Sequence, residues 1–341
     1  MQSFRIAHII TETKDAKTFV LQATGNATTN YKAGQFVTLV FDTKFGEKRR
    51  SYSISSSPDI NEPFSITIKK VENGEFSRML ITHAKVGDIL SSSGINGFFH
   101  LPDNMEGIQQ FFFLAAGTGI TPCYSIIKTL LATTKKQVVL IYSNRQEKDT
   151  IFYKQLQWLK QQYPQQFQIH FLFSIHTDVF RSRLNNWLLQ QLLKKYLFAE
   201  KTKTLFYLCG PFEYMQMVNI ILLIEGVPSS HIRKENFNAL PRKEKPAPPD
   251  KDAHMVTIYF ENKSQELAVQ YPVTILAAAK AANINIPYSC EAGRCGSCVA
   301  TCIKGKIWMA YNEVLMDDEI EKGRILCCQA YAVNGDAEIV V

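Results

Sequence analysis

The chain has 341 residues, of which 46% are hydrophobic and 20% charged, a composition typical of a soluble protein with two or three domains. Its formal charge of +7 is uneven, because residues 253–341 carry −3 and residues 1–252 carry +10. The basic residues are scattered and no helix-turn-helix or RNA-binding signature accompanies them, so we expect no nucleic-acid partner.

The N-terminal residues predict no targeting segment. They lack a basic stretch followed by an apolar stretch and a cleavage site. The longest unbroken apolar run, residues 111–116, is too short to cross a bilayer, so we expect no membrane insertion. Eight cysteines in a chain of this length without a secretion signal favour reduced, metal-binding thiols and a cytoplasmic location.

Residues 1–103 show short stretches of alternating apolar character, such as 36–41 and 64–68, punctuated by Gly and Asn. This pattern predicts an antiparallel sheet or barrel. The segment contains R-S-Y-S at 50–53 and G-E-F-S at 74–77. An arginine for a diphosphate, an aromatic ring and a hydroxyl suit a flavin, although R-x-Y-S alone also describes a strand with polar edges.

From residue 110 onward, the spacing of apolar residues along the chain changes. Apolar strands, F-F-F-L-A-A, V-V-L-I-Y-S, F-Q-I-H-F-L-F-S and T-L-F-Y-L-C-G, alternate with expected helices, one of them at 153–162. This alternation predicts a parallel sheet with crossover helices.

G-T-G-I-T-P at 117–122 follows the first of these strands and opens a helix. Glycines let the backbone approach a pyrophosphate, and a helix N-terminus favours its negative charge. The alternative is a tight strand-to-helix turn without a ligand. Y-S-N-R and C-G-P end two further strands, where ligands of open α/β sheets bind. Arg145 could form two parallel hydrogen bonds with a 2'-phosphate and so select NADPH, or it could be a solvated loop arginine. Arg181 and Arg183 are weaker candidates for binding the 2'-phosphate.

The stretch 241–252, P-R-K-E-K-P-A-P-P-D-K-D, predicts an extended linker. Beyond it, Cys290, Cys295, Cys298 and Cys328 have the C-x4-C-x2-C…C spacing of the ligands of a plant-type [2Fe-2S] cluster. A zinc site needs a second C-x2-C or a His pair, which the adjacent Cys327 and Cys328 do not supply. Small residues around the loop favour a cluster, because backbone N–H groups must reach its sulfurs.

The order R-x-Y-S, G-x-x-S, G-T-G-I-T-P and C-G-P resembles the ferredoxin-NADP reductase superfamily, and C-E-A-G-R-C-G-S-C with L-C-C-Q resembles a plant-type ferredoxin. The whole is similar to the reductase subunit of the phenylacetyl-CoA epoxidase system and to related oxygenase reductases. The resemblance implies a multidomain chain: an antiparallel β-barrel FAD domain (1–103), an α/β parallel-sheet NAD(P) domain (104–240), the linker (241–252) and an α+β β-grasp [2Fe-2S] domain (253–341).

The resemblance also implies residue roles. The implied flavin-binding residues are Arg50, Ser51, Tyr52, Ser53, Ile68, Gly74, Phe76 and Ser77, with Phe237 closing the flavin face. The implied nicotinamide-nucleotide residues are Gly117, Thr118, Gly119, Thr121, Ser143, Arg145, Arg183, Cys209, Gly210 and Pro211. The residues implied at the reacting site are Ser53, Cys209 and Glu235. The L-x-C-Q pattern selects Cys328 as the fourth ligand, and the additional Cys302 and Cys327 are expected to be small buried hydrophobic residues.

Hydride carries two electrons and a [2Fe-2S] cluster accepts one, so a flavin is expected between NADPH or NADH and the cluster. FAD is favoured over FMN because the flavin motifs are similar to those of FAD-bearing relatives. We expect a reductase that passes electrons to a protein acceptor such as an oxygenase, epoxidase or desaturase. The alternatives are an electron carrier or redox-sensing subunit without its own nicotinamide site, or a general ferredoxin or flavodoxin reductase.

Overall fold

The computed structural model describes residues 1–25, 29–44, 46–175, 182–237, 246–260 and 263–341. Contacts divide the chain into two compact units, Met1–Asn236 and Phe237–Val341. Among the described residues, no helix has the length and apolar character needed to cross a membrane. Arg181 and residues 241–245 of the expected linker lie outside the described residues.

The first unit begins with six antiparallel strands in the order β4-β3-β6-β1-β2-β5. They are β1 (Gln2–Thr13), β2 (Ala16–Thr24), β3 (Phe36–Thr43), β4 (Gly46–Ser53), β5 (Ser65–Lys69) and β6 (Ile89–Asn96), and helix α1 (Glu75–His83) lies between β5 and β6 in the sequence. The bridge between Ile54 and Ile66 connects the end of β4 to β5. Because β4 and β5 are the outer strands of the sheet, this bridge closes it into a barrel.

The barrel interior is filled by large apolar side chains that alternate along the strands. Phe4, Phe19, Leu39, Ile54 and Ile66 are fully buried in one core. This alternation is what the period-2 pattern of the sequence specifies, because successive side chains of a strand point to opposite faces. The prediction of an antiparallel domain is confirmed.

The second half of the first unit is a parallel sheet with the strand order β11-β10-β7-β8-β9. Its strands are β7 (Gln110–Ala116), β8 (Gln137–Asn144), β9 (Phe167–Phe173), β10 (Thr204–Cys209) and β11 (Ile232–Glu235). Its helices are α2 (Ile120–Thr133), α3 (Tyr153–Gln162), α5 (Asn186–Tyr196) and α6 (Phe212–Ile224). Its short 3-10 helices are η2 (Gly117–Gly119), η3 (Glu147–Asp149), η4 (Lys201–Lys203) and η5 (Ser229–His231), and one more, η1 (Pro58–Ile60), lies between β4 and β5 of the barrel half.

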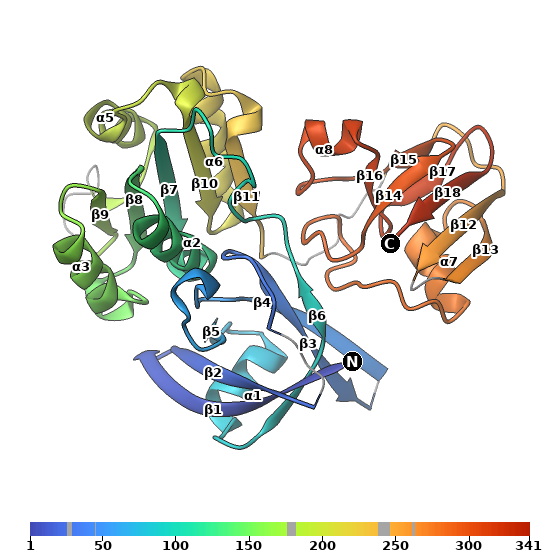
Figure 1. Ribbon diagram of the computed structural model, residues 1–341, viewed down its shortest axis with the longest axis horizontal. Coiled ribbons are helices and arrows are strands. Elements are labelled where there is room, and N and C mark those ends of the chain that lie inside the picture. The colour runs from blue at the N-terminus through green and yellow to red at the C-terminus, as the bar shows by residue number, and fades with distance from the viewer. Residues whose placement is uncertain (26–28, 45, 176–181, 238–245, 261–262) are drawn as a thin grey trace. The chain divides into compact units, whose positions relative to one another are not determined.

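Helices cover both faces of this sheet (Figure 1). Phe111 and Phe113 of β7 pack into the core that includes α2 and α3. Phe112 and Leu114, one residue out of phase, pack into the core that includes α5 and α6. All seven residues of β7 are therefore buried, as expected for a central parallel strand.

The barrel and the parallel sheet share an apolar contact. Phe99, which follows β6, packs edge-on against Tyr207 of β10, with ring centroids 5.1 Å apart. The Tyr207 hydroxyl donates to the carbonyl oxygen of His100 at 3.0 Å. Gly97 precedes this contact with φ 122° and lies against the Phe36 ring, where an added Cβ would be 3.0 Å from ring carbons.

The second unit contains a mixed sheet in the order β13-β12-β18-β14-β16 and a two-stranded sheet of β15 and β17. Its elements are β12 (His254–Phe260), β13 (Lys263–Val269), α7 (Ile275–Ala281), β14 (Val299–Lys304), β15 (Ile307–Met309), α8 (Asp317–Glu321), β16 (Arg324–Leu326), β17 (Ala330–Ala332) and β18 (Ala337–Val340). The first and last strands, β12 and β18, pair in parallel at its centre, and the other pairs are antiparallel. The α+β class expected for this segment is confirmed.

Candidate functional site

Strand β4 presents Arg50 and Tyr52 on one face, because residues two apart in a strand point the same way. The Arg50 guanidinium lies 5.3 Å from the centroid of the Phe76 ring, and Phe76 stacks on Phe41. Tyr52 is half-buried, and burial raises the pKa of its phenol, so the ring stays neutral. On the opposite face, the Ser51 hydroxyl lies 3.0 Å from that of Thr38.

The G-E-F-S turn forms the N-terminus of α1. Gly74 is the residue before the first helical turn, and a Cβ there would lie 2.5 Å from Ser77 Oγ. The Ser77 hydroxyl accepts a hydrogen bond from the Val71 N–H at 3.2 Å, so the turn is closed on itself. Phe76 thus connects this turn to Arg50. The Ile68 side chain is only 1% exposed and belongs to the barrel core, so any ligand contact of Ile68 would come from its main chain.

Ser53 and Glu235, 182 residues apart in sequence, meet in the first unit. The Ser53 hydroxyl donates to a Glu235 carboxylate oxygen at 3.3 Å. Glu235 ends β11, and its register partner on β10 is Cys209. Burial raises the pKa of Glu235 to about 8, and the hydrogen bond from Ser53 opposes part of that rise. Near neutral pH this carboxyl therefore carries its proton.

The G-T-G-I-T-P turn lies against the end of β10. A Cβ on Gly119 would lie 1.9 Å from the Cys209 carbonyl oxygen, and one on Gly210 would lie 2.9 Å from the Ala116 Cβ. Gly117 adopts φ 54°, the left-handed region that favours glycine. Thr121 donates to the Thr118 carbonyl oxygen at 2.9 Å and fixes the first turn of α2.

The contacts of Ser53 with Glu235 and of Gly119 with Cys209 lie at the carboxyl ends of β7, β10 and β11, at one edge of the sheet. Cys209 is fully buried, and burial raises the pKa of its thiol well above the usual value, so it is neutral. Cys123 of α2 is also fully buried, and its thiol pKa is raised by burial and by the charge of Glu235. Sequence reasoning did not single out Cys123, since a cysteine within an apolar helix carries no local signal of a site.

Strand β8 lies beside β7, and it ends at the candidate phosphate residues. The Tyr142 hydroxyl donates to the Gly117 carbonyl oxygen at 3.0 Å, so β8 supports the glycine turn directly. Ser143 is half-buried, and Arg145 is exposed at the end of the strand. Arg183 is also exposed, beyond β9. Pro211 is the N-cap residue of α6 beyond the end of β10, which lies on the other side of β7.

In the second unit, the predicted cluster ligands form two pairs of thiols. Cys290 hydrogen-bonds with Cys295, and Cys298 hydrogen-bonds with Cys328. Two thiols per metal ion are what the two iron atoms of a [2Fe-2S] cluster require, so this pairing fits the group that the spacing predicts.

The loop that carries three of these cysteines directs backbone N–H groups to the sulfurs. The Ala292 N–H donates to the Cys290 Sγ at 3.4 Å, and the Ser297 N–H donates to the Cys295 Sγ at 3.5 Å. Gly293 has φ 72°, and a Cβ there would lie 2.9 Å from the Tyr311 carbonyl oxygen. A thiolate-rich cluster is stabilised by such donors, so the loop fits a [2Fe-2S] group.

The two additional cysteines and Phe237 also lie in the second unit. Cys327 is completely buried, and its N–H donates to the Cys298 carbonyl oxygen at 3.0 Å, so its main chain supports the ligand loop. Cys302 is half-buried, and its thiol donates to the Lys304 carbonyl oxygen at 3.4 Å. Phe237 is 46% exposed and is the first residue of this unit.

Three family models match the chain in succession. An oxidoreductase FAD-binding domain matches residues 3–101, an oxidoreductase NAD-binding domain matches residues 113–219, and a 2Fe-2S iron-sulfur cluster binding domain matches residues 258–333. The three expected groups therefore each have a domain in this chain, in the predicted order.

Curated relatives match along almost their full length. The ferredoxin reductase component of the 3-ketosteroid-9-alpha-monooxygenase of Mycobacterium tuberculosis is 31% identical, with 98% of this chain and 94% of the relative covered. One of the subunits of the 1,2-phenylacetyl-CoA epoxidase of Escherichia coli is also 31% identical, with 99% of this chain and 96% of the relative covered.

The solved structure of phthalate dioxygenase reductase, described as a modular structure for electron transfer from pyridine nucleotides to [2Fe-2S], is similar in fold. It is 25% identical, with a TM-score of 0.61, 99% of this chain covered and 97% of that chain covered. The chain is thus an oxidoreductase that belongs to the ferredoxin-NADP reductase superfamily, in the group of oxygenase reductase components with a C-terminal [2Fe-2S] domain.

Proposed function

We propose that this protein takes hydride from NADPH or NADH and delivers single electrons, through FAD and a [2Fe-2S] cluster, to the oxygenase component of a monooxygenase or epoxidase system. The observation that supports this most strongly is the presence of all three domains in one chain whose relatives are reductase components of such systems. FAD, when bound, accepts two electrons together and releases them one at a time.

In this proposal the barrel binds FAD through β4 and α1. Arg50 pairs with the diphosphate, and its stacking on Phe76 restricts the guanidinium to one side of the strand. Gly74 and Ser77 bring the N-terminus of α1 to the same negative charge, which a helix N-terminus favours. Tyr52 supplies a neutral aromatic face for the flavin ring.

The reacting edge is formed by Ser53, Glu235 and Cys209. Ser53 offers a hydroxyl beside the flavin ring, and Glu235 holds that hydroxyl in place. Because Glu235 and Cys209 are both neutral near pH 7, this edge presents no fixed negative charge to a hydride donor. Gly119 and Gly210 let the glycine turn pack directly against the end of β10, where a Cβ would meet protein atoms, and this close packing places the turn that binds the nucleotide beside Cys209.

The nucleotide preference proposed is for NADPH. Arg145 follows β8 directly, and β8 lies beside the strand that carries the glycine turn. Its exposed guanidinium suits a 2'-phosphate, which forms two parallel hydrogen bonds with arginine. Arg183 beyond β9 is a second candidate for the same charge. We also propose that the protein acts in the cytoplasm, where nicotinamide nucleotides and reduced thiols are available.

The proposal is tested by anaerobic titration of the purified holoprotein with NADPH and, separately, with NADH. Visible spectra follow the flavin and the cluster, and electron paramagnetic resonance detects the reduced cluster. We expect NADPH to bleach both chromophores at lower concentration than NADH. A protein whose flavin and cluster are reduced by dithionite but by neither nucleotide would be an electron carrier and not a reductase.

A further inference from the structure

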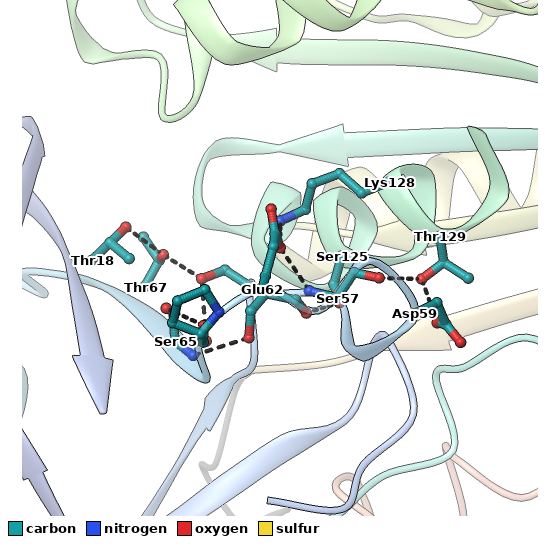
Figure 2. A network of polar contacts seen from close by, with 12 residues as sticks. Thr18, Ser57, Asp59, Glu62, Ser65, Thr67, Ser125, Lys128 and Thr129 are labelled. Atoms are coloured by element: carbon teal, nitrogen blue, oxygen red, sulfur yellow. Dashed lines mark hydrogen bonds and ion pairs between the residues drawn. The ribbon is translucent and has the colours of Figure 1, made fainter. Parts of the chain in front are cut away.

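Helix α2 of the parallel-sheet domain contacts the barrel through apolar side chains, with Ile126 against Gly34, and also through a set of polar side chains. The partner of the polar set is the segment that follows β4 and includes η1. We call this set of contacts the interdomain latch; its residues are Ser56, Ser57, Asp59 and Glu62 on the barrel and Ser125, Lys128 and Thr129 on α2. Figure 2 shows Ser57, Asp59 and Glu62 of the barrel segment facing Ser125, Lys128 and Thr129 of α2.

Thr129 lies at one end of the latch. Its hydroxyl donates to an Asp59 carboxylate oxygen at 2.9 Å and lies 2.7 Å from the Ser57 hydroxyl. Ser125, one turn earlier on α2, donates to the carbonyl oxygen of Ser56. Each hydrogen bond fixes a distance and a direction, so together they fix the rotation of α2 relative to the segment.

Lys128 forms the ion pair of the latch. Its ammonium group pairs with the Glu62 carboxylate, lies 4.3 Å from the centroid of the Tyr124 ring, and is almost completely buried. The Glu62 carboxylate also accepts the Ser57 N–H at 2.8 Å. Burial lowers the pKa of Lys128, and the charge of Glu62 opposes this.

A buried lysine contributes little net stability to a contact between two surfaces, because an apolar residue would pack there without losing hydration. Apolar contacts alone tolerate sliding, whereas the ion pair of the buried Lys128 and the three hydroxyl contacts each need a partner at a defined position and so restrict α2 to one register. The composition of the latch therefore favours a role in alignment over a role in adhesion.

The two sides of the latch continue directly into the two proposed reacting sites. On the barrel side, Ser56 is three residues beyond Ser53 of β4. On the other side, Lys128 is eight residues, or about 12 Å of helix, beyond the first residue of α2, which follows the glycine turn. A rigid latch therefore fixes the distance between the flavin strand and the nicotinamide turn.

We propose that Lys128 and Thr129 are positioning residues for hydride transfer: through the interdomain latch they hold the bound nicotinamide at reacting distance from the flavin. This inference rests on the proposed function. Reaction rates depend steeply on such distances, and a misplacement of about 1 Å costs on the order of 100-fold. Loosening the latch is thus expected to slow the transfer without removing either binding site.

The test measures flavin reduction by NADPH in the holoprotein under anaerobic stopped flow, which separates the limiting rate from the nucleotide dissociation constant. Thr129→Val removes the hydroxyl and keeps the shape of the side chain. Thr133→Val is the matched control, since the exposed Thr133 hydroxyl donates to the Thr129 carbonyl oxygen within the same helix. Lys128→Met removes the charge, and Lys128→Arg retains it.

We expect Thr129→Val and Lys128→Met to lower the limiting rate about tenfold or more, with a dissociation constant within about twofold of the wild type. The primary deuterium isotope effect on flavin reduction should be at least as large in these variants as in the wild type, because the chemical step becomes slower. Thr133→Val should match the wild type, and Lys128→Arg should recover most of the loss. If Lys128→Met does not retain flavin, the limiting rate of Thr129→Val alone tests the proposal.

A wild-type limiting rate in Thr129→Val, with or without a lower melting temperature, would overturn the proposal and leave the latch a structural contact. A change in the dissociation constant without a change in rate would overturn it equally. A wild-type protein that neither nucleotide reduces would instead reject the proposed function, so the two failures are distinguishable.

Discussion

Glu235 gives the sharpest test of the proposed reacting edge, because its protonation differs from that of an ordinary glutamate. Burial raises its pKa from 4.5 to about 8, so about nine tenths of the carboxyl groups are neutral at pH 7. Infrared difference spectra of the holoprotein should show a protonated carboxyl band that disappears with a midpoint near pH 8. Glu235→Gln should remove this band.

The sign of the effect on stability follows from the direction of the shift. A folded-state pKa above the unfolded value means that the folded protein holds the proton more tightly. The stabilising contribution is then complete below about pH 4.5 and is lost as the pH rises through about 8. Relative to Glu235→Gln, the wild type should therefore lose stability as the pH rises from 5 to 9.

The shift sets a ceiling of about 5 kcal/mol on this loss, at about 1.36 kcal/mol per pKa unit. Water entry and local relaxation reduce the penalty for a buried charge, so about 2–3 kcal/mol is the expected change. It is measured by chemical denaturation followed through flavin release at each pH. Ser53→Ala removes the hydrogen bond that lowers this pKa, and should move the infrared midpoint upward.

Two results would refute this reasoning. One is a carboxyl band that titrates near pH 4.5, which would mean that Glu235 is solvated and charged. The other is an identical pH dependence of stability in the wild type and Glu235→Gln. A downward movement of the midpoint in Ser53→Ala would show that Ser53 stabilises the neutral form and would contradict a hydrogen bond from Ser53 to the charged carboxylate.

Three further predictions concern the nucleotide and cluster sites. Gly119→Ala should lower the melting temperature and abolish NADPH binding, because its Cβ would lie 1.9 Å from a backbone oxygen. In Gly117→Ala the added Cβ faces open space, so the free energy of unfolding should fall by only about 1–2 kcal/mol, the cost of the positive φ. Equal melting temperatures of Gly119→Ala and Gly117→Ala would contradict this prediction. Arg145→Ala should raise the KM for NADPH about tenfold or more and leave that for NADH unchanged, since a charged hydrogen bond contributes about 1.5–3 kcal/mol; unchanged values for both would make it an ordinary loop arginine. Cys328→Ser should abolish the ferredoxin-like absorbance while Cys327→Ser retains it, because Cys328 is the thiol that hydrogen-bonds with Cys298; the reverse result would reassign the fourth ligand.

The sequence alone determined the order and class of the domains. The change from a two-residue to a helical period near residue 110 is a local signal, and so are the glycine turn and the cysteine spacing. The helix expected at 153–162 is found at Tyr153–Gln162, and the turn at 117–122 opens α2. Such features are encoded by neighbouring residues, because backbone conformation and the choice of buried face depend on short-range patterns.

The tertiary structure decided which distant residues meet. Periodicity shows that a face is buried but not what covers it, so the contact of Ser53 with Glu235 could not be derived from either strand. The sequence around Glu62 indicates only a polar turn. The packing of α2 against this segment makes Lys128 part of the interdomain latch. The division of four cysteines into two pairs is equally a property of the folded loop, since spacing gives the ligand set and folding gives the partners.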